Sequence, residues 1–274
     1  MLGPWRLGVM QGRLLPKYKG RYQAHPKGYW RDEFPRAAER GLDLIEFILD
    51  FEDAAKNPLL ADVEAIRAAT RASGVGVATI CADYFMEAPL HRTDTAAASG
   101  AILDRLIESA AALKASDIVI PCVDHSRLAD AADEARLVAA LTRALPKAEE
   151  AGVNLSLETD LDPARFGRLL ERFPSPRVTV NYDIGNSAAL GYDPVAEWAV
   201  YGQRVSDVHI KDRTRGGGSV ELGTGDADIS SVLDLMRQND FAGPVIMQAF
   251  RDDEGLAVFG RQMEWLSRQG AAHV

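Results

Sequence analysis

Eight short apolar runs, rich in β-branched residues, recur along the chain and limit the folds that it can adopt. They are Leu7–Met10, Leu44–Leu49, Val75–Cys81, Ile118–Pro121, Val153–Leu157, Val178–Tyr182, Val205–Ile210 and Val245–Phe250. They begin roughly 25 to 40 residues apart, which is the length of a strand followed by a crossover helix. Apolar residues dominate most of them, as is typical of parallel strands covered on both faces. The spacing therefore predicts repeated strand–helix units.

Helical patterns fill the segments between these runs. They are Arg31–Arg40, Leu59–Ser73, Thr93–Lys114, Asp130–Ala151, Pro163–Phe173, Pro194–Tyr201, Ile229–Asn239 and Asp253–Gln269. Asp162 precedes Pro163 and Asp193 precedes Pro194, which is the order expected at the start of a helix. Eight strands alternating with eight helices predict an α/β fold, a single (β/α)8 TIM barrel spanning residues 1–274. A doubly wound open sheet is the less favoured alternative, because no G-x-G-x-x-G follows the first run.

Composition narrows the class of protein. Hydrophobic residues make up 47% of the chain, enough for one large core. No segment approaches the roughly 20 apolar residues of a membrane span, and Arg6 and Arg13 interrupt the first segment where a signal peptide would be apolar. The two cysteines, Cys81 and Cys122, favour free thiols in a reducing compartment. We therefore expect a cytoplasmic protein with no membrane partner, and a homo-oligomer remains open.

The net charge argues against nucleic acid as a partner. The chain carries a formal charge of −9, whereas a protein that binds duplex DNA normally presents a basic face. An acidic chain can still carry a basic cleft, so the charge disfavours this class of function without excluding it. We expect a small-molecule partner instead.

Four consecutive predicted strands carry polar side chains at matching depth near their ends: Glu158, Asp183, His209 and Gln248. Active sites of this barrel are built at the carboxyl ends of the strands. Three oxygen donors and one imidazole suit a single divalent ion with positions open to substrate, with Mn²⁺ as the first expectation and Mg²⁺, Co²⁺ or Zn²⁺ as alternatives. Each carboxylate could instead cap a helix or pair with an arginine.

Several stretches resemble the xylose-isomerase-like barrel superfamily, and in particular its sugar phosphate isomerase/epimerase group. They are VMQGRL at Val9–Leu14, GRYQAHP at Gly20–Pro26, LETDL at Leu157–Leu161, NYDIGN at Asn181–Asn186, HIKDR at His209–Arg213 and ELGTGDAD at Glu221–Asp228. The resemblance covers nearly the whole chain. It implies a carbohydrate substrate and a metal held by Glu158, Asp183, His209 and the residue at position 248.

The chain departs from the ketose epimerases of that superfamily at two positions. Those enzymes carry a glutamate where this chain has Gln248, and they use it with the glutamate matching Glu158 as paired acid/base groups on either face of the sugar. An amide oxygen can bind a metal but cannot take a proton near neutral pH. Asn186 stands where those epimerases have a histidine. We therefore expect single-face proton transfer through an enediolate, or a β-elimination, rather than fast epimerisation.

Two residues are candidate catalytic groups. Glu158 is the first candidate base. Lys211 lies two residues beyond His209, so the two side chains share a face of the strand. Near a metal, the pKa of a buried lysine can fall far enough for it to act as a base. The alternative is a lysine paired with a carboxylate such as Glu158 or Asp183.

Six residues are candidates for binding substrate: Arg13, Gln23, His25, Glu46, Asn186 and Arg213. An arginine can hold a phosphate or carboxylate through two parallel hydrogen bonds. Arg213 is favoured because it lies within the HIKDR stretch. His25 could contact substrate or hold its own loop, and Glu46 could contact substrate or orient another residue of the site.

These observations favour a divalent-metal-dependent isomerase or epimerase that acts on a keto sugar, sugar phosphate or related polyol through an enediolate. A lyase or dehydratase acting on a keto-inositol or oxidised sugar is the first alternative. A sugar-binding barrel without chemistry is another, because Gln248 replaces an acidic residue. A DNA-repair endonuclease on the same barrel would need many histidine ligands, and the chain has five histidines in all.

Overall fold

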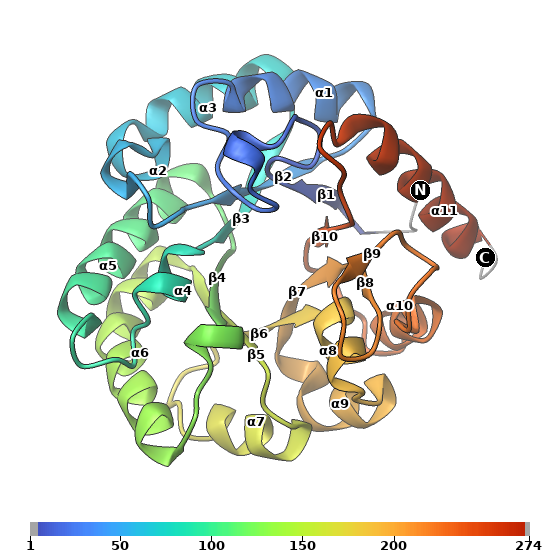
Figure 1. Cartoon of the computed structure of the whole chain (residues 1–274). Coiled ribbons are helices and arrows are strands. Elements are labelled where there is room, and N and C mark those ends of the chain that lie inside the picture. Colours follow the sequence, from blue (N-terminus) through green and yellow to red (C-terminus); the bar gives the residue numbers. More distant parts are fainter. Residues whose placement is uncertain (1–4, 272–274) are drawn as a thin grey trace.

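Eight parallel strands close into a barrel in the computed structural model, which describes residues 5–271 (Figure 1). The strands are β1 Leu7–Met10, β2 Leu44–Ile48, β3 Gly76–Cys81, β4 Asp117–Cys122, β5 Asn154–Thr159, β6 Val178–Asp183, β7 Val205–Ile210 and β10 Val245–Met247. Their order around the barrel is β1-β10-β7-β6-β5-β4-β3-β2. Two short strands, β8 Asp212–Arg213 and β9 Ser219–Val220, form a separate antiparallel ribbon. The closed sheet confirms the predicted (β/α)8 fold and excludes the open-sheet alternative.

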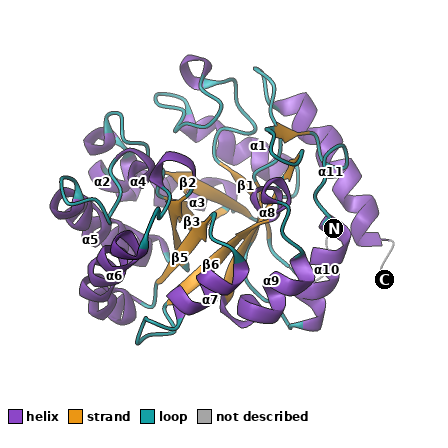
Figure 2. Ribbon diagram, turned by 60° about the horizontal axis from the view of Figure 1, so that its bottom comes forward, coloured by secondary structure: helices purple, strands orange, loops and turns teal. Residues whose placement is uncertain are grey.

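The helices surround the strands, as Figures 1 and 2 show. They are α1 Glu33–Glu39, α2 Pro58–Ala61, α3 Val63–Ser73, α4 Tyr84–Glu87, α5 Ala96–Leu113, α6 Ala131–Ala151, α7 Pro163–Leu170, α8 Ile184–Leu190, α9 Pro194–Tyr201, α10 Ile229–Gln238 and α11 Leu256–Ala271. Short 3-10 turns are Tyr18–Gly20, Trp30–Asp32, Ala54–Lys56, Asp124–Ser126 and Gly202–Arg204. None of the described helices is long and apolar enough to cross a membrane.

Aspartate caps start several helices where the sequence predicts them. The Asp162 side chain accepts a hydrogen bond from the backbone N–H of Arg165 (2.9 Å) at the start of α7. Asp193 accepts from the N–H of Val195 (3.1 Å) at the start of α9. A proline follows each aspartate as the first helical residue, where its missing N–H costs nothing. The predicted cap-and-proline starts are therefore confirmed.

One predicted helix is divided in two. The segment Leu59–Ser73 was expected to be continuous, but α2 ends at Ala61 and α3 begins at Val63. Asp62, between them, has a φ of −161° and accepts a hydrogen bond from the N–H of Ala65. A short polar side chain that bonds the following backbone competes with helix continuation, so the chain bends here.

The inside of the barrel is polar beneath the strand ends. Glu46, Asp117, Ser156 and Asp207 are all buried. The Asp207 carboxylate accepts hydrogen bonds from Ser156 Oγ and from Asn181 Nδ2, both at 2.7 Å. Burial raises the pKa of Asp117 and of Asp207. The large apolar core therefore lies between barrel and helices, while a buried hydrogen-bond network fills part of the barrel interior.

Candidate active site

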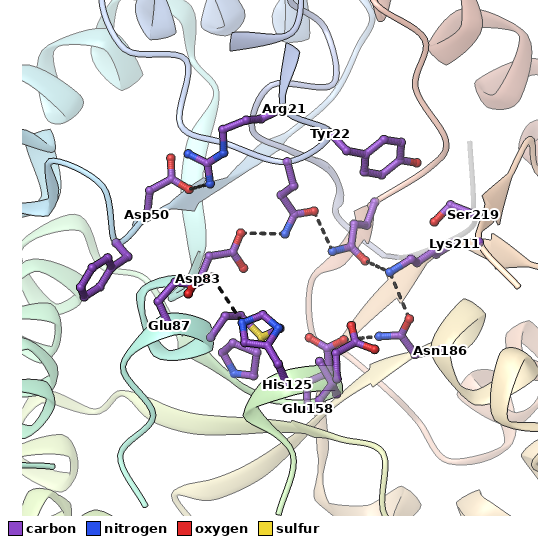
Figure 3. Close-up of a pocket in the computed structure, with 18 of the residues that line it drawn as sticks. Arg21, Tyr22, Asp50, Asp83, Glu87, His125, Glu158, Asn186, Lys211 and Ser219 are labelled. Atoms are coloured by element: carbon purple, nitrogen blue, oxygen red, sulfur yellow. Dashed lines mark hydrogen bonds and ion pairs between the residues drawn. The ribbon is translucent and has the colours of Figure 1, made fainter. Parts of the chain in front are cut away.

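A cavity of about 690 Å³ opens at the carboxyl ends of the strands. This is the end at which (β/α)8 barrels assemble their sites. Figure 3 shows that side chains from several strand ends line it. Those used below are Gln23, Asp83, Glu158, Asn186, Lys211, Arg213 and Gln248. Polar and charged groups dominate this set, as expected for a small hydrophilic ligand.

Asp183 and His209 lie side by side on neighbouring strands, near the ends that carry the cavity. The register of β6 and β7 pairs them, and His209 Nδ1 is 3.9 Å from Asp183 Oδ2. The other ring nitrogen, Nε2, is 3.0 Å from Glu46 Oε2. Nδ1 is buried and has no hydrogen-bond partner among the described residues. A buried nitrogen without a partner, facing a carboxylate and held from behind by another, is the arrangement of a histidine metal ligand.

The electrostatics of the site also fit a cation. Burial and the neighbouring Asp183 charge raise the pKa of Glu158 to about 7, although His209 and Lys211 act in the opposite direction. Burial lowers the pKa of His209, but Glu46, Glu158 and Asp183 outweigh it and raise that pKa to about 10. Glu158 thus holds a proton more tightly than it would in water, and a bound divalent ion would relieve the same excess of negative charge.

Glu46 lies inside the barrel rather than in the cavity. It is fully buried and contacts His209 through both carboxylate oxygens, at 3.0 and 3.2 Å from Nε2. Glu46, Asp207 and His209 offer ligand atoms within 4.8 Å of one another, and among the described residues this is the cluster compact enough to hold a cation without rearrangement. The Asp207 oxygens already accept bonds from Ser156 and Asn181. The open ring nitrogen of His209 instead lies on the side of Asp183, the last residue of β6, so Glu46 fits a residue that orients the imidazole.

Lys211 is a paired ammonium group. Its Nζ donates to Asp183 Oδ2 (3.1 Å), Asn186 Oδ1 (3.1 Å) and Gln248 Oε1 (3.0 Å). This matches the paired alternative considered for Lys211 from the sequence. It also means that the amide oxygen of Gln248 is already engaged, so Gln248 would have to exchange this bond to ligate a metal.

Asn186 connects the candidate base to the cationic side of the cavity. Its Nδ2 donates to Glu158 Oε1 at 2.5 Å, and its Oδ1 accepts from Arg213 Nη1 at 2.7 Å. The first turn of α8 fixes its position, because Asp183 Oδ1 accepts from the Asn186 backbone N–H at 2.8 Å. Arg213 also donates to the carbonyl of Gly217 through Nε and Nη2. Asn186 and Arg213 therefore line the cavity in fixed orientations.

Gln23 and Asp83 form another wall. Gln23 Oε1 accepts from Arg13 Nη2 (3.0 Å) and from Gln248 Nε2 (3.2 Å). Gln23 Nε2 donates to Asp83 Oδ2 (2.9 Å), and Cys81 Sγ lies 3.2 Å from Asp83 Oδ1. Asp83 was not among the candidate site residues. Its position two residues after β3, level with the other strand ends, is the signal in the sequence that could have identified it.

Arg13 and His25 lie away from the cavity lining. Arg13 is 1% exposed and its Nε donates to the carbonyl of Ala249, while burial lowers its pKa. The His25 ring lies 3.0 Å from Gln11 Oε1 and packs 5.3 Å from the Phe47 ring, and burial lowers its pKa to about 4. Both side chains hold the segment after β1, so we leave them out of the proposed substrate-binding set.

The model of one protein family, the xylose isomerase-like TIM barrel, matches residues 34–269. A curated relative, the 2-epi-5-epi-valiolone 7-phosphate 2-epimerase of Actinoplanes sp., is 28% identical over 241 residues, which cover 85% of this chain and 87% of the relative.

Two solved structures are similar in fold. The D-allulose 3-epimerase from Methylomonas sp. in complex with D-allulose has a TM-score of 0.76 at 18% identity, covering 97% of each chain. The IOLI protein with a bound zinc atom has a TM-score of 0.77 at 14% identity, covering 98% of this chain and 99% of that one. Identities this low bear on the fold alone.

The family match spans most of the chain, and the closed barrel with polar strand ends agrees with it. The curated relative is an epimerase of 2-epi-5-epi-valiolone 7-phosphate. The chain is accordingly an enzyme rather than a binding barrel without chemistry, and it belongs to the xylose isomerase-like TIM barrel family.

Proposed function

We propose that this protein is a divalent-metal-dependent isomerase or epimerase that acts on a phosphorylated keto sugar or keto-cyclitol through an enediolate. The observation that carries the proposal is the unpartnered Nδ1 of His209, which lies 3.9 Å from Oδ2 of Asp183, the last residue of β6. Glu158 completes a set of two carboxylates and one imidazole. This donor set suits Mn²⁺ first, with Mg²⁺, Co²⁺ and Zn²⁺ as alternatives, and the zinc of the IOLI protein supports metal binding on this fold.

Glu158 is the proposed base. Its carboxylate lines the cavity and can accept a proton from a carbon next to the substrate carbonyl. Asn186 fixes one of its oxygens, Oε1, by donating to it. Bound metal would polarise the substrate carbonyl and stabilise the charge that develops on the enediolate. Lys211, held between Asp183 and Gln248, adds a fixed positive charge at the same wall.

The two sides of the cavity differ in charge, which suggests how a phosphorylated substrate lies. Lys211 and Ser219 are on one side, whereas Asp83, Glu87 and the ion pair of Asp50 with Arg21 are on the other, so that side carries the excess of carboxylates (Figure 3). Arg213 also lines the cavity. We place the phosphate on the side of Arg213 and Lys211, because a carboxylate-rich wall would repel it. The relative that acts on a cyclitol 7-phosphate supports a phosphorylated substrate.

The test of this function is solvent exchange at a carbon next to a carbonyl. Native protein is incubated with Mn²⁺ in D₂O with 2-epi-5-epi-valiolone 7-phosphate or D-allulose 6-phosphate, and proton NMR follows loss of the carbon-bound proton. We expect metal-dependent exchange or conversion, and a loss of about 10²–10⁴-fold in Glu158→Gln. The surface variant Glu64→Gln is the matched control, since Glu64 lies on α3 away from the cavity. Equal exchange with and without metal would contradict the proposal.

A further inference from the structure

We propose that Asp83 supplies the acid/base group that Gln248 lacks, so that Glu158 and Asp83 together invert one carbinol carbon of the substrate. The inference rests on the proposed function. It changes the expectation drawn from the sequence, where a neutral residue at position 248 argued against fast epimerisation.

The positions of the two carboxyl groups support a reaction between them. Asp83 follows β3 and Glu158 lies in β5, and both line the same cavity. Figure 3 shows them on different walls. A substrate held between these walls would present one carbon to a carboxyl group from each side.

No structural role among the described residues explains the half-buried carboxyl group of Asp83. It occupies the N-cap position of α4, yet its side chain makes no capping hydrogen bond. Within residues 5–271, its oxygens contact Gln23 Nε2 and Cys81 Sγ and no cation lies within ion-pair distance. Burial raises its pKa, while Gln23 and Arg13 lower it and Glu46 raises it. A carboxyl group that stays protonated closer to neutral pH can serve as an acid.

The hydrogen-bond network explains why position 248 carries an amide when Asp83 carries the carboxyl group. Lys211 donates to Gln248 Oε1, so the Gln248 amide group faces Gln23 Oε1. Gln23 can then turn its own NH₂ to Asp83. A carboxylate at position 248 would meet Gln23 Oε1, an acceptor facing an acceptor, and Gln23 would have to reverse. The network thus contains a carboxyl group at Asp83 and an amide at Gln248.

The proposed step balances without a further reactant. Glu158 removes the proton of the carbinol carbon: the C–H bond breaks, its electron pair enters the enediolate, and the proton resides on Glu158. The Asp83 carboxyl group then delivers its proton to the opposite face of that carbon, and the electron pair of the enediolate forms the new C–H bond. Asp83 is left as a carboxylate and Glu158 as an acid, and exchange with water in the open cavity restores both. No atom is oxidised or reduced.

The experiment separates the two half-reactions. Full-length, Mn²⁺-loaded Asp83→Asn is incubated in D₂O with 2-epi-5-epi-valiolone 7-phosphate, and NMR measures exchange into the starting compound and formation of its epimer. Epimer formation should fall by about 10²–10⁴-fold, while exchange by Glu158 continues within about tenfold of the native rate. Adding Gln248→Glu to Asp83→Asn should restore epimer formation at least about tenfold, because it returns a carboxyl group to the network.

The controls keep the outcome interpretable. Asp253→Asn changes a side chain that is 86% exposed and should leave both rates unchanged. Asp83→Ser removes the carboxyl group differently and repeats the test if Asp83→Asn does not fold; Mn²⁺ titration checks that each variant retains its site. Native rates of epimer formation in both Asp83 variants would overturn the inference. Absence of any exchange by the native enzyme would instead contradict the proposed function itself, and this inference with it.

Discussion

Glu33 shows how a single buried carboxyl group holds the backbone next to the site. Its Oε2 accepts from the N–H of Gly12 (2.7 Å) and its Oε1 from that of Leu14 (3.0 Å). The side chain is fully buried, and burial raises its pKa from 4.5 to about 7 despite these bonds and the nearby Arg13. The Glu33 carboxyl group therefore stabilises the segment that leads from β1 to Gln23, and it holds its proton more tightly in the folded protein than in the unfolded chain.

This shift gives a pH dependence of stability with a defined sign. Below about pH 4.5 Glu33 is protonated in both states; between pH 4.5 and 7 the unfolded chain loses the proton first. The contribution of Glu33 to the free energy of unfolding therefore decreases by roughly 3 kcal/mol as the pH rises through that window. Above pH 7 this contribution no longer changes. Urea unfolding measures the free energy of unfolding of the native protein and of Glu33→Gln. The difference in favour of the native protein should become smaller from pH 4.5 to 7. Parallel curves, or an advantage that grows with pH, would contradict this assignment.

Strand spacing predicts which residues come together at the site, but it does not predict the hydrogen-bond partners of these residues. Glu158 and Asp183 directly follow runs that could be recognised as strands, and His209 is the last residue but one of such a run, so their convergence was predictable. The sequence does not show that Glu46 points inward to the imidazole, because a run that is apolar on both faces hides which residues face the barrel axis. Arg13 resembled a cavity arginine, but its contacts lie in the segment after β1.

At the scale of elements, the long sequence patterns predicted the architecture, whereas the shortest helices were not predicted. The eight strands lie where the apolar runs begin, and β10 stops early at Met247 because the Gln248 N–H bonds back to the carbonyl of Ile246. Helices α4 and α8 have four and seven residues, too few to show a helical period. Yet α8 is the element that places Asn186 against Glu158.

The β8–β9 ribbon yields a prediction about substrate charge. It carries Arg213, which it fixes through the carbonyl of Gly217. Arg213→Ala should raise KM for D-allulose 6-phosphate by about 10–100-fold, the loss of a charged hydrogen bond, with a much smaller effect on D-allulose. Arg215→Ala is the matched control, because Arg215 lies outside the cavity lining. Equal losses for both sugars would show that Arg213 does not bind the phosphate.

At the scale of the whole molecule, closure of the barrel brings strand ends from distant parts of the sequence to one mouth. Glu46 and His209 are 163 positions apart along the chain, and Gln23 and Gln248 are 225 apart, yet each pair is hydrogen-bonded. The fold could be predicted because closure follows from eight strand–helix units. The polar network inside the barrel could not, since it depends on the register between strands.

The central claim is that one divalent ion binds at the strand ends through the open nitrogen of His209. Anomalous diffraction from crystals soaked in Mn²⁺, recorded at the manganese edge, tests it most directly. We predict one strong peak bonded to His209 Nδ1, Asp183 and Glu158, and its loss in His209→Ala. A peak between Glu46 and Asp207 inside the barrel, or none at the strand ends at saturating Mn²⁺, would contradict the account.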